Sequence, residues 1–237
     1  MIRHLGTSLR ITIVTVILLG LVYPFVMTGI AQAIFPWQAN GSFITVDGKH
    51  SNTSKNAIGS AIIGQLWTKP EYFHGRPSAA GKNGYDPTAT GGTNLGPTSK
   101  KLIATTKATI AQVEKENPDA SGPPPMDLVT SSASGIDPDI TPEAAYYQAP
   151  RVAKARNLSL AKINALIAAH IQGRTFGFLG EPHVNVLELN LALSSYVKGT
   201  GSRVAGSAID SNVFDVDFVL EDDEVPPNGD IVFSFQG

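Results

Sequence analysis

The side chains of this sequence that could act in nucleophilic catalysis are serines, an aspartate and two histidines. The parts of a Ser-His-Asp set are present as Ser131, Ser132 and Ser134, with Asp137, and with His74 or His170. In such a set the histidine accepts the proton of the serine hydroxyl. Neither a G-x-S-x-G elbow nor an S-x-x-K spacing surrounds these serines. A serine hydrolase is therefore kept as an alternative function.

The sequence also contains side chains that could bind a metal ion. Five histidines are spread along the chain, at His4, His50, His74, His170 and His183. No two have the spacing of paired ligands, and the Glu181-Pro182-His183 run is too constrained to chelate one ion with both side chains. Cysteine is absent, which excludes thiolate zinc sites, disulfides and a cysteine nucleophile. We expect no metal site.

A glycine-rich stretch, Tyr72–Ser99, raises the question of phosphate binding. A P-loop requires a lysine and a Ser or Thr after its second glycine, whereas Pro97 follows Gly96 here. A dinucleotide-binding turn requires a preceding buried strand and a later acid, and both are missing. Backbone amides around Gly91 could still form an anion-binding nest. A nucleotide-binding regulator is thus a second alternative.

The elements that position these residues begin with an apolar segment. Ile11–Phe35 contains no charged residue over 25 positions, which as a helix span roughly 37 Å and cross a bilayer core of about 30 Å. Arg3 and Arg10 precede it, and the next charge is Asp47. Because positive charge favours the cytoplasmic side, residues 1–10 are expected in the cytoplasm and the rest outside. This predicts a single-pass membrane protein, surrounded by lipid.

A cleaved signal peptide is the alternative for this segment, since Ala31-Gln32-Ala33 resembles a cleavage site. The apolar run is longer than the usual signal core, which favours a retained anchor. Tyr23-Pro24, in the middle of the run, is expected to kink the helix.

The remainder is expected to form one extracytoplasmic α+β domain over 36–199, followed by an acidic extension over 200–237. Helices are predicted near 101–116, 141–156, 159–172 and 185–197. Their N-terminal caps are expected to be Thr141, Ser159 and Asn185. Strand number and order are not determined by the pattern. The extension carries eight acids and one arginine, and it is expected to be a hairpin or disordered. A net charge of −2 for the whole chain gives no reason to expect nucleic acid as a partner.

Four stretches resemble a known family in sequence, order and spacing. They are YFHGRPSA (Tyr72–Ala79), GGTNLGPTS (Gly91–Ser99), DLVTSSASGIDPDITPEAAYYQAPRVAKAR (Asp127–Arg156) and GRTFGFLGEPHVNVLELNLAL (Gly173–Leu193). Together with the N-terminal span they resemble the C subunit of the Kdp potassium-transporting ATPase over about residues 5–197. The acidic tail after about Tyr196 has no counterpart in that pattern.

The resemblance implies a non-catalytic accessory subunit of a high-affinity, ATP-driven potassium uptake complex in the bacterial inner or plasma membrane. Its implied partners are a channel-like A subunit, a P-type ATPase B subunit and a small F subunit. The family is also described as a catalytic chaperone that raises the ATP affinity of the B subunit through a transient ternary complex. The chain would then have no cofactor of its own. An outward-facing domain is at odds with direct ATP contact, so assembly is the role we expect first.

The resemblance gives the glycine-rich stretch a docking role on a partner's outer surface. Arg76, held near Pro77, offers fixed donors, while Gly91, Gly92 and Gly96 permit close backbone approach. Candidate partner contacts are His74, Arg76, Asn94 and Arg174.

Overall fold

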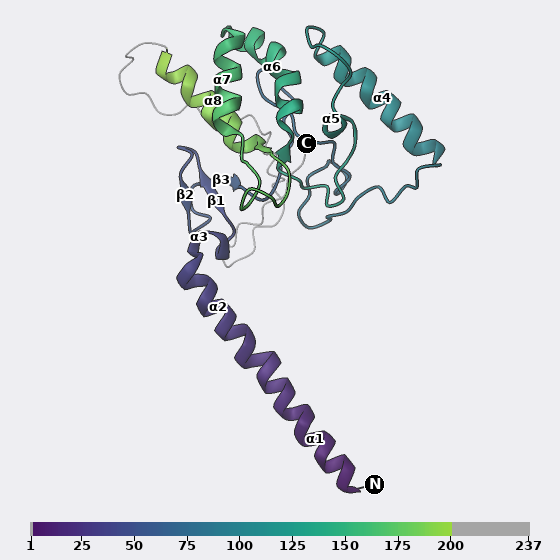
Figure 1. Ribbon diagram of the computed structural model, residues 1–237, viewed down its shortest axis with the longest axis vertical. Helices are drawn as coiled ribbons and strands as arrows, with labels where there is room; N and C mark the ends of the chain where they lie inside the picture. Colours follow the sequence, from purple (N-terminus) through teal and green to yellow (C-terminus); the bar gives the residue numbers. More distant parts are fainter. Residues whose placement is uncertain (1, 201–237) are drawn as a thin grey trace, which may run out of the picture. The chain divides into compact units, whose positions relative to one another are not determined.

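A computed structural model describes residues 2–200, and its chain divides into two compact units after Ile62 (Figure 1). Each unit is described by itself. The acidic extension expected over 200–237 lies outside the described residues, apart from its first residue.

One continuous helical rod opens the first unit. It consists of α1 (Ile2–Ile17), a π-helical turn η1 (Leu18–Val22) and α2 (Tyr23–Ile34). Its section His4–Ile34, 31 residues, is long and apolar enough to cross a membrane. The single N-terminal span expected from the sequence is therefore confirmed as a helix. Ile11 lies inside this helix, and Phe35 follows its last residue.

The π-helical turn accommodates the proline that follows it. Pro24 has no N–H, and in a regular α-helix its ring would clash with the carbonyl four residues earlier, at Gly20. In η1 the chain widens, so that the Tyr23 N–H donates to the carbonyl of Leu18, five residues back. The disturbance expected at Tyr23-Pro24 thus takes the form of a wider turn on its N-terminal side.

The first unit continues with a short helix and a small antiparallel sheet. These elements are α3 (Pro36–Ala39), β1 (Phe43–Thr45), β2 (His50–Ser51) and β3 (Ala57–Ser60), in sheet order β2-β1-β3. Trp37 connects them, because its indole N–H donates to the Phe43 carbonyl at 2.9 Å and its ring stacks on His50 at 3.7 Å. Asn40 also binds Gln32 at the end of α2, at 2.9 Å. The sheet is therefore fastened to the helix.

The second unit contains five helices and a two-stranded sheet among its described residues. In order they are α4 (Lys100–Glu116), α5 (Met126–Val129), β4 (Asp139–Ile140), α6 (Pro142–Arg156), α7 (Leu160–His170), β5 (Val184–Asn185) and α8 (Val186–Thr200). The four predicted helices are present with ends shifted by at most a few residues, and the fold is a mixture of helix and strand as expected. β4 and β5 pair antiparallel, with Asp139 opposite Asn185.

The core of the second unit lies between α6, α7 and α8 (Figure 1). Its fully buried aliphatic side chains include Ala144, Ala149, Val152, Ile163, Ile167, Leu189 and Leu193. The small side chains on α6 permit a close approach of α7. Asn157 joins the two helices in the left-handed conformation, with a φ of 54°, which asparagine tolerates better than most residues.

Two of the three expected caps are confirmed. The Thr141 hydroxyl accepts the Ala144 N–H at 3.2 Å, and the Asn185 side-chain oxygen Oδ1 accepts the Glu188 N–H at 3.2 Å. The expectation for Ser159 was wrong, because its side chain makes no cap hydrogen bond. The Lys162 N–H, which such a cap would bind, donates to the Ser159 backbone carbonyl at 3.0 Å.

Candidate functional site

The glycine-rich stretch begins as an extended segment held by side chains from two helices. The side-chain amide of Asn190, on α8, accepts the Phe73 N–H at 2.9 Å and donates to the Phe73 carbonyl at 3.0 Å. Gln148, on α6, does the same for His74, at 2.8 and 3.1 Å. Both amides are buried, with exposed fractions of 1% or less. Helix side chains thus satisfy the backbone groups that a neighbouring strand would bind in a sheet.

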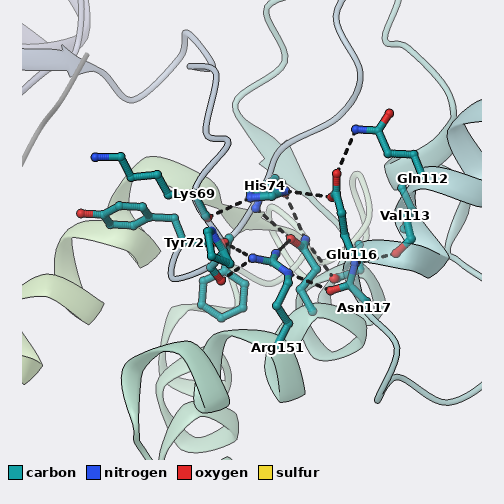
Figure 2. A network of polar contacts seen from close by, with 12 residues as sticks. Lys69, Tyr72, His74, Gln112, Val113, Glu116, Asn117 and Arg151 are labelled. Carbon is teal, nitrogen blue, oxygen red and sulfur yellow. Dashed lines mark hydrogen bonds and ion pairs between the residues drawn. The ribbon is translucent and has the colours of Figure 1, made fainter. Parts of the chain in front are cut away.

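Arg151 lies at the centre of the polar network beneath this segment (Figure 2). Its Nε donates to Asn117 Oδ1 at 2.9 Å. Its Nη1 donates to the carbonyls of Pro70 and Tyr72, the latter at 3.0 Å. Its Nη2 donates to Gln148 Oε1 at 2.7 Å. One guanidinium therefore joins the end of α4, the middle of α6 and the extended segment.

Burial lowers the pKa of Arg151 to about 10, while the carboxylates of Glu116 and Glu71 oppose this shift. The side chain is still charged at neutral pH. All three guanidinium nitrogens make hydrogen bonds inside the unit. A buried donor or acceptor that loses its partner costs free energy, so these bonds fix the positions of the groups around Arg151.

His74 lies at the edge of the same network (Figure 2). Its Nε2 is 3.0 Å from the Lys69 carbonyl, and its Nδ1 is 3.5 Å from Glu116 Oε2. Burial is the main cause that lowers the pKa of His74 below its usual value, and the charge of Arg151 adds to it. The hydrogen bond to the Lys69 backbone carbonyl and the Glu116 carboxylate oppose this shift. The imidazole is therefore neutral at pH 7, and it links the extended segment to the end of α4.

Arg76 anchors the next part of the stretch to the loop before β4. Its Nη1 lies 3.0 Å from Asp137 Oδ2. The Tyr85 hydroxyl donates to the Arg76 carbonyl, and burial of the phenol raises the pKa of Tyr85 to about 12. Ser78 Oγ accepts the Tyr85 N–H at 2.7 Å and donates to the Gly135 carbonyl. Arg76 is thus engaged within its own unit.

Two glycines show that close approach within the unit accounts for part of the glycine content. Gly135 has a φ of +72°, and a Cβ there would lie 2.6 Å from the Cβ of Ala80. A Cβ on Gly92 would lie 3.1 Å from the Ala133 carbonyl oxygen. At Gly91 and Gly96 a Cβ would meet nothing within 4 Å. Of the three glycines expected to permit close approach, Gly91 and Gly96 therefore have free space beside them, whereas Gly92 does not.

The four expected partner contacts do not form one cluster of interacting side chains. His74 and Arg76 are partly buried and contact Glu116 and Asp137, respectively. Asn94 is exposed, in the left-handed conformation with a φ of 52°. Arg174 is exposed and pairs with Glu181 at 2.6 Å. Their contact with a partner remains a prediction.

The arrangement does not support a serine hydrolase. Ser132 Oγ accepts the Gly135 N–H at 2.9 Å and so stabilises its own turn. The ring of His74 contacts the Lys69 carbonyl and Glu116, and the ring of His170 contacts the Leu166 carbonyl at 2.8 Å. Each histidine is therefore engaged with groups other than serine, and the base that a nucleophile requires is not provided.

Potential metal ligands occur only as pairs in the part of the chain that the structure describes. His74 lies near Glu116, and His183 lies 4.0 Å from Asp139. No group of three or more such side chains converges there.

Sequence reasoning missed the residues that organise the site, namely Gln148, Arg151 and Asn190. A signal was available, because Asn190 falls on the same helical face as Leu187 and Leu191, which are both buried. A polar side chain on an apolar face must find a partner when it is buried. Only the fold reveals that this partner is the backbone of Phe73, 117 positions earlier.

Comparison with known proteins gives a consistent family match. The model of the KdpC family, described as "K+-transporting ATPase, c chain", matches residues 5–195. Three relatives are each named "Potassium-transporting ATPase KdpC subunit". The protein of Myxococcus xanthus is 53% identical, over 79% of this chain and 85% of its own length. The protein of Koribacter versatilis is 52% identical, over 81% of this chain and 94% of its own length. The protein of Nitratidesulfovibrio vulgaris is 47% identical, over 84% of this chain and 98% of its own length. The resemblance read from the four motifs is therefore confirmed, and this chain belongs to the KdpC family, the C chains of K⁺-transporting ATPases.

Proposed function

We propose that this chain is a non-catalytic accessory subunit that assembles and stabilises an ATP-driven potassium uptake complex. The observation that carries the proposal is the family match over residues 5–195. The fold agrees with such a role, because the side chains at the centre of the site hold backbone segments together rather than surrounding a reactive group.

The proposed topology places residues 1–10 in the cytoplasm and the domain of 36–199 outside the membrane. Arg3 and Arg10 before the apolar helix support this orientation. Because the natural chain has no cysteine, single cysteines can report it. Ser8→Cys and Asn83→Cys both replace exposed residues. In intact spheroplasts an impermeant maleimide should label position 83 and not position 8, and the reverse pattern would overturn the orientation.

The proposed partners are the channel-like A subunit, the P-type ATPase B subunit and the small F subunit. Among the candidate contacts, the exposed Asn94 and Arg174 are suited to touch a partner directly. His74 and Arg76 would act by holding the loop in shape, since both are engaged internally.

A second part of the proposal concerns ATP. The chain would raise the ATP affinity of the B subunit through a transient ternary complex, without a nucleotide site of its own. The test is K⁺-stimulated ATP hydrolysis by membranes that contain the other subunits, with and without this chain. We expect activity to be lost, or the KM for ATP to rise, when the chain is left out. Equal activity and equal KM without it would overturn the proposed function.

A further inference from the structure

A loop between α7 and β5 exposes three large apolar side chains in four positions. Phe176 is 84% exposed, Phe178 is 71% exposed and Leu179 is 50% exposed. Neither the core of the second unit nor the polar network uses them. Clustered exposed apolar side chains in a soluble region mark interaction sites, whereas single ones do not. We call this cluster the apolar knob.

The knob has a defined structure of its own. At its base Gln172 and His183 exchange backbone hydrogen bonds of 2.8 and 3.0 Å. Nearer the tip Thr175 and Leu179 exchange two more, of 2.9 and 3.0 Å. His183 leads directly into β5, which pairs with β4. The apolar side chains are therefore presented by a hydrogen-bonded stem.

The backbone of the knob has an unfavourable conformation at its most exposed residue. Phe176 has a φ of 54°, in the left-handed region that bulky residues avoid. Nothing in the second unit's core requires a phenylalanine there, because its side chain points mostly into solvent. Such strain is typical of positions where the side chain serves binding.

We propose that the apolar knob inserts into an apolar recess on another membrane-resident subunit of the K⁺-transporting ATPase. Charge favours a protein recess over a lipid surface. The one arginine of the loop, Arg174, is paired with Glu181 at 2.6 Å, and this carboxylate balances its charge toward anionic headgroups. A polar rim around an apolar centre is the usual composition of a protein interface.

The size of the knob also bears on its partner. Three such side chains bury on the order of 400 Å², well below the roughly 1,200 Å² of a stable free-standing interface. A knob of this size holds a partner only if another attachment raises the effective concentration. The apolar N-terminal helix supplies one, which points to a subunit in the same membrane. The inference rests on the proposed function.

Affinity purification of the detergent-solubilised complex through a tag on this chain tests the proposal. Phe176→Asn with Phe178→Ser removes both aromatic rings, and asparagine suits the left-handed backbone. We expect recovery of the other subunits to fall at least about tenfold, with a thermal midpoint of the purified chain that is unchanged or higher. Met126→Gln, at a 70% exposed apolar residue outside the knob, should keep full recovery. Full recovery with the double variant would overturn the knob and leave the proposed function intact. No recovery with the unsubstituted chain would instead contradict the proposed function.

A photo-crosslinking amino acid in place of Phe178, in the otherwise unchanged complex, identifies the occupant directly. A crosslink to another subunit of the transporter supports the proposal. A crosslink to lipid, to a second copy of this chain or within the same chain overturns it, and so does the absence of any crosslink.

Discussion

At the residue scale, the fold of the second unit depends on a few polar side chains in an apolar setting. Arg151, Gln148 and Asn190 are buried, and each binds the backbone of the segment around Phe73. A buried polar network stabilises the fold when every member has its partner, and an unpaired member destabilises it. Substitution of one member should therefore cost more than its own hydrogen bonds suggest.

Arg151→Met tests this dependence. The substitution keeps an apolar stem but leaves the carbonyls of Pro70 and Tyr72 and the amide oxygen of Asn117 without their donor. We expect the free energy of unfolding to fall by about 3 kcal/mol, measured by denaturant unfolding of the detergent-solubilised chain. Lys154→Met, on the same helix but exposed and paired with the exposed Asp119, should change it by less than about 1 kcal/mol. Equal effects of the two substitutions would contradict the central role of Arg151.

The pH dependence of stability should report His74. Its pKa in the folded chain is lowered by burial from the ordinary 6.5, so below about pH 6.5 the unfolded chain takes up a proton that the folded chain does not. The free energy of unfolding should therefore begin to fall as the pH drops to about 6.5, and it should fall further below that pH. His74→Gln should remove this part of the profile. If the free energy of unfolding of His74→Gln changes with pH as steeply as that of the natural chain, groups other than His74 cause the dependence.

At the element scale, the sequence was informative where structure is local. The long helices follow from apolar periodicity and from caps such as Thr141 and Asn185. The two- to four-residue strands could not be predicted, because their pairing depends on distant partners. The extended segment around Phe73 was unpredictable for the same reason, since its partners lie on α6 and α8.

Thr141 precedes α6 and Ser159 precedes α7, and the two positions give a matched test of capping. Thr141→Ala removes the hydroxyl that accepts the Ala144 N–H and should lower the free energy of unfolding by about 1 kcal/mol. Ser159→Ala, at the corresponding position of α7, should cost clearly less, because Ser159 makes no such bond. Chemical denaturation of both variants measures the difference, and a larger cost for Ser159→Ala would contradict the assigned hydrogen bonds.

At the scale of the whole molecule, the chain combines a helix suited to a membrane with a unit whose polar network is structural. The family match places this combination in a K⁺-transporting ATPase. In the role proposed above, the chain contributes shape and attachment, and the chemistry belongs to other subunits. The candidate contacts were only partly readable from the sequence. Arg174 and Asn94 are exposed as a contact must be, whereas His74 and Arg76 proved to be engaged inside the unit.

The most direct test of the subunit role is copurification from potassium-starved cells. The chain would be tagged at its C-terminus, extracted in mild detergent and analysed for what accompanies it. We predict recovery of a P-type ATPase and a large polytopic membrane protein, and loss of both when residues 5–36 are replaced by an unrelated apolar span. Recovery of this chain alone across several detergents would contradict the account.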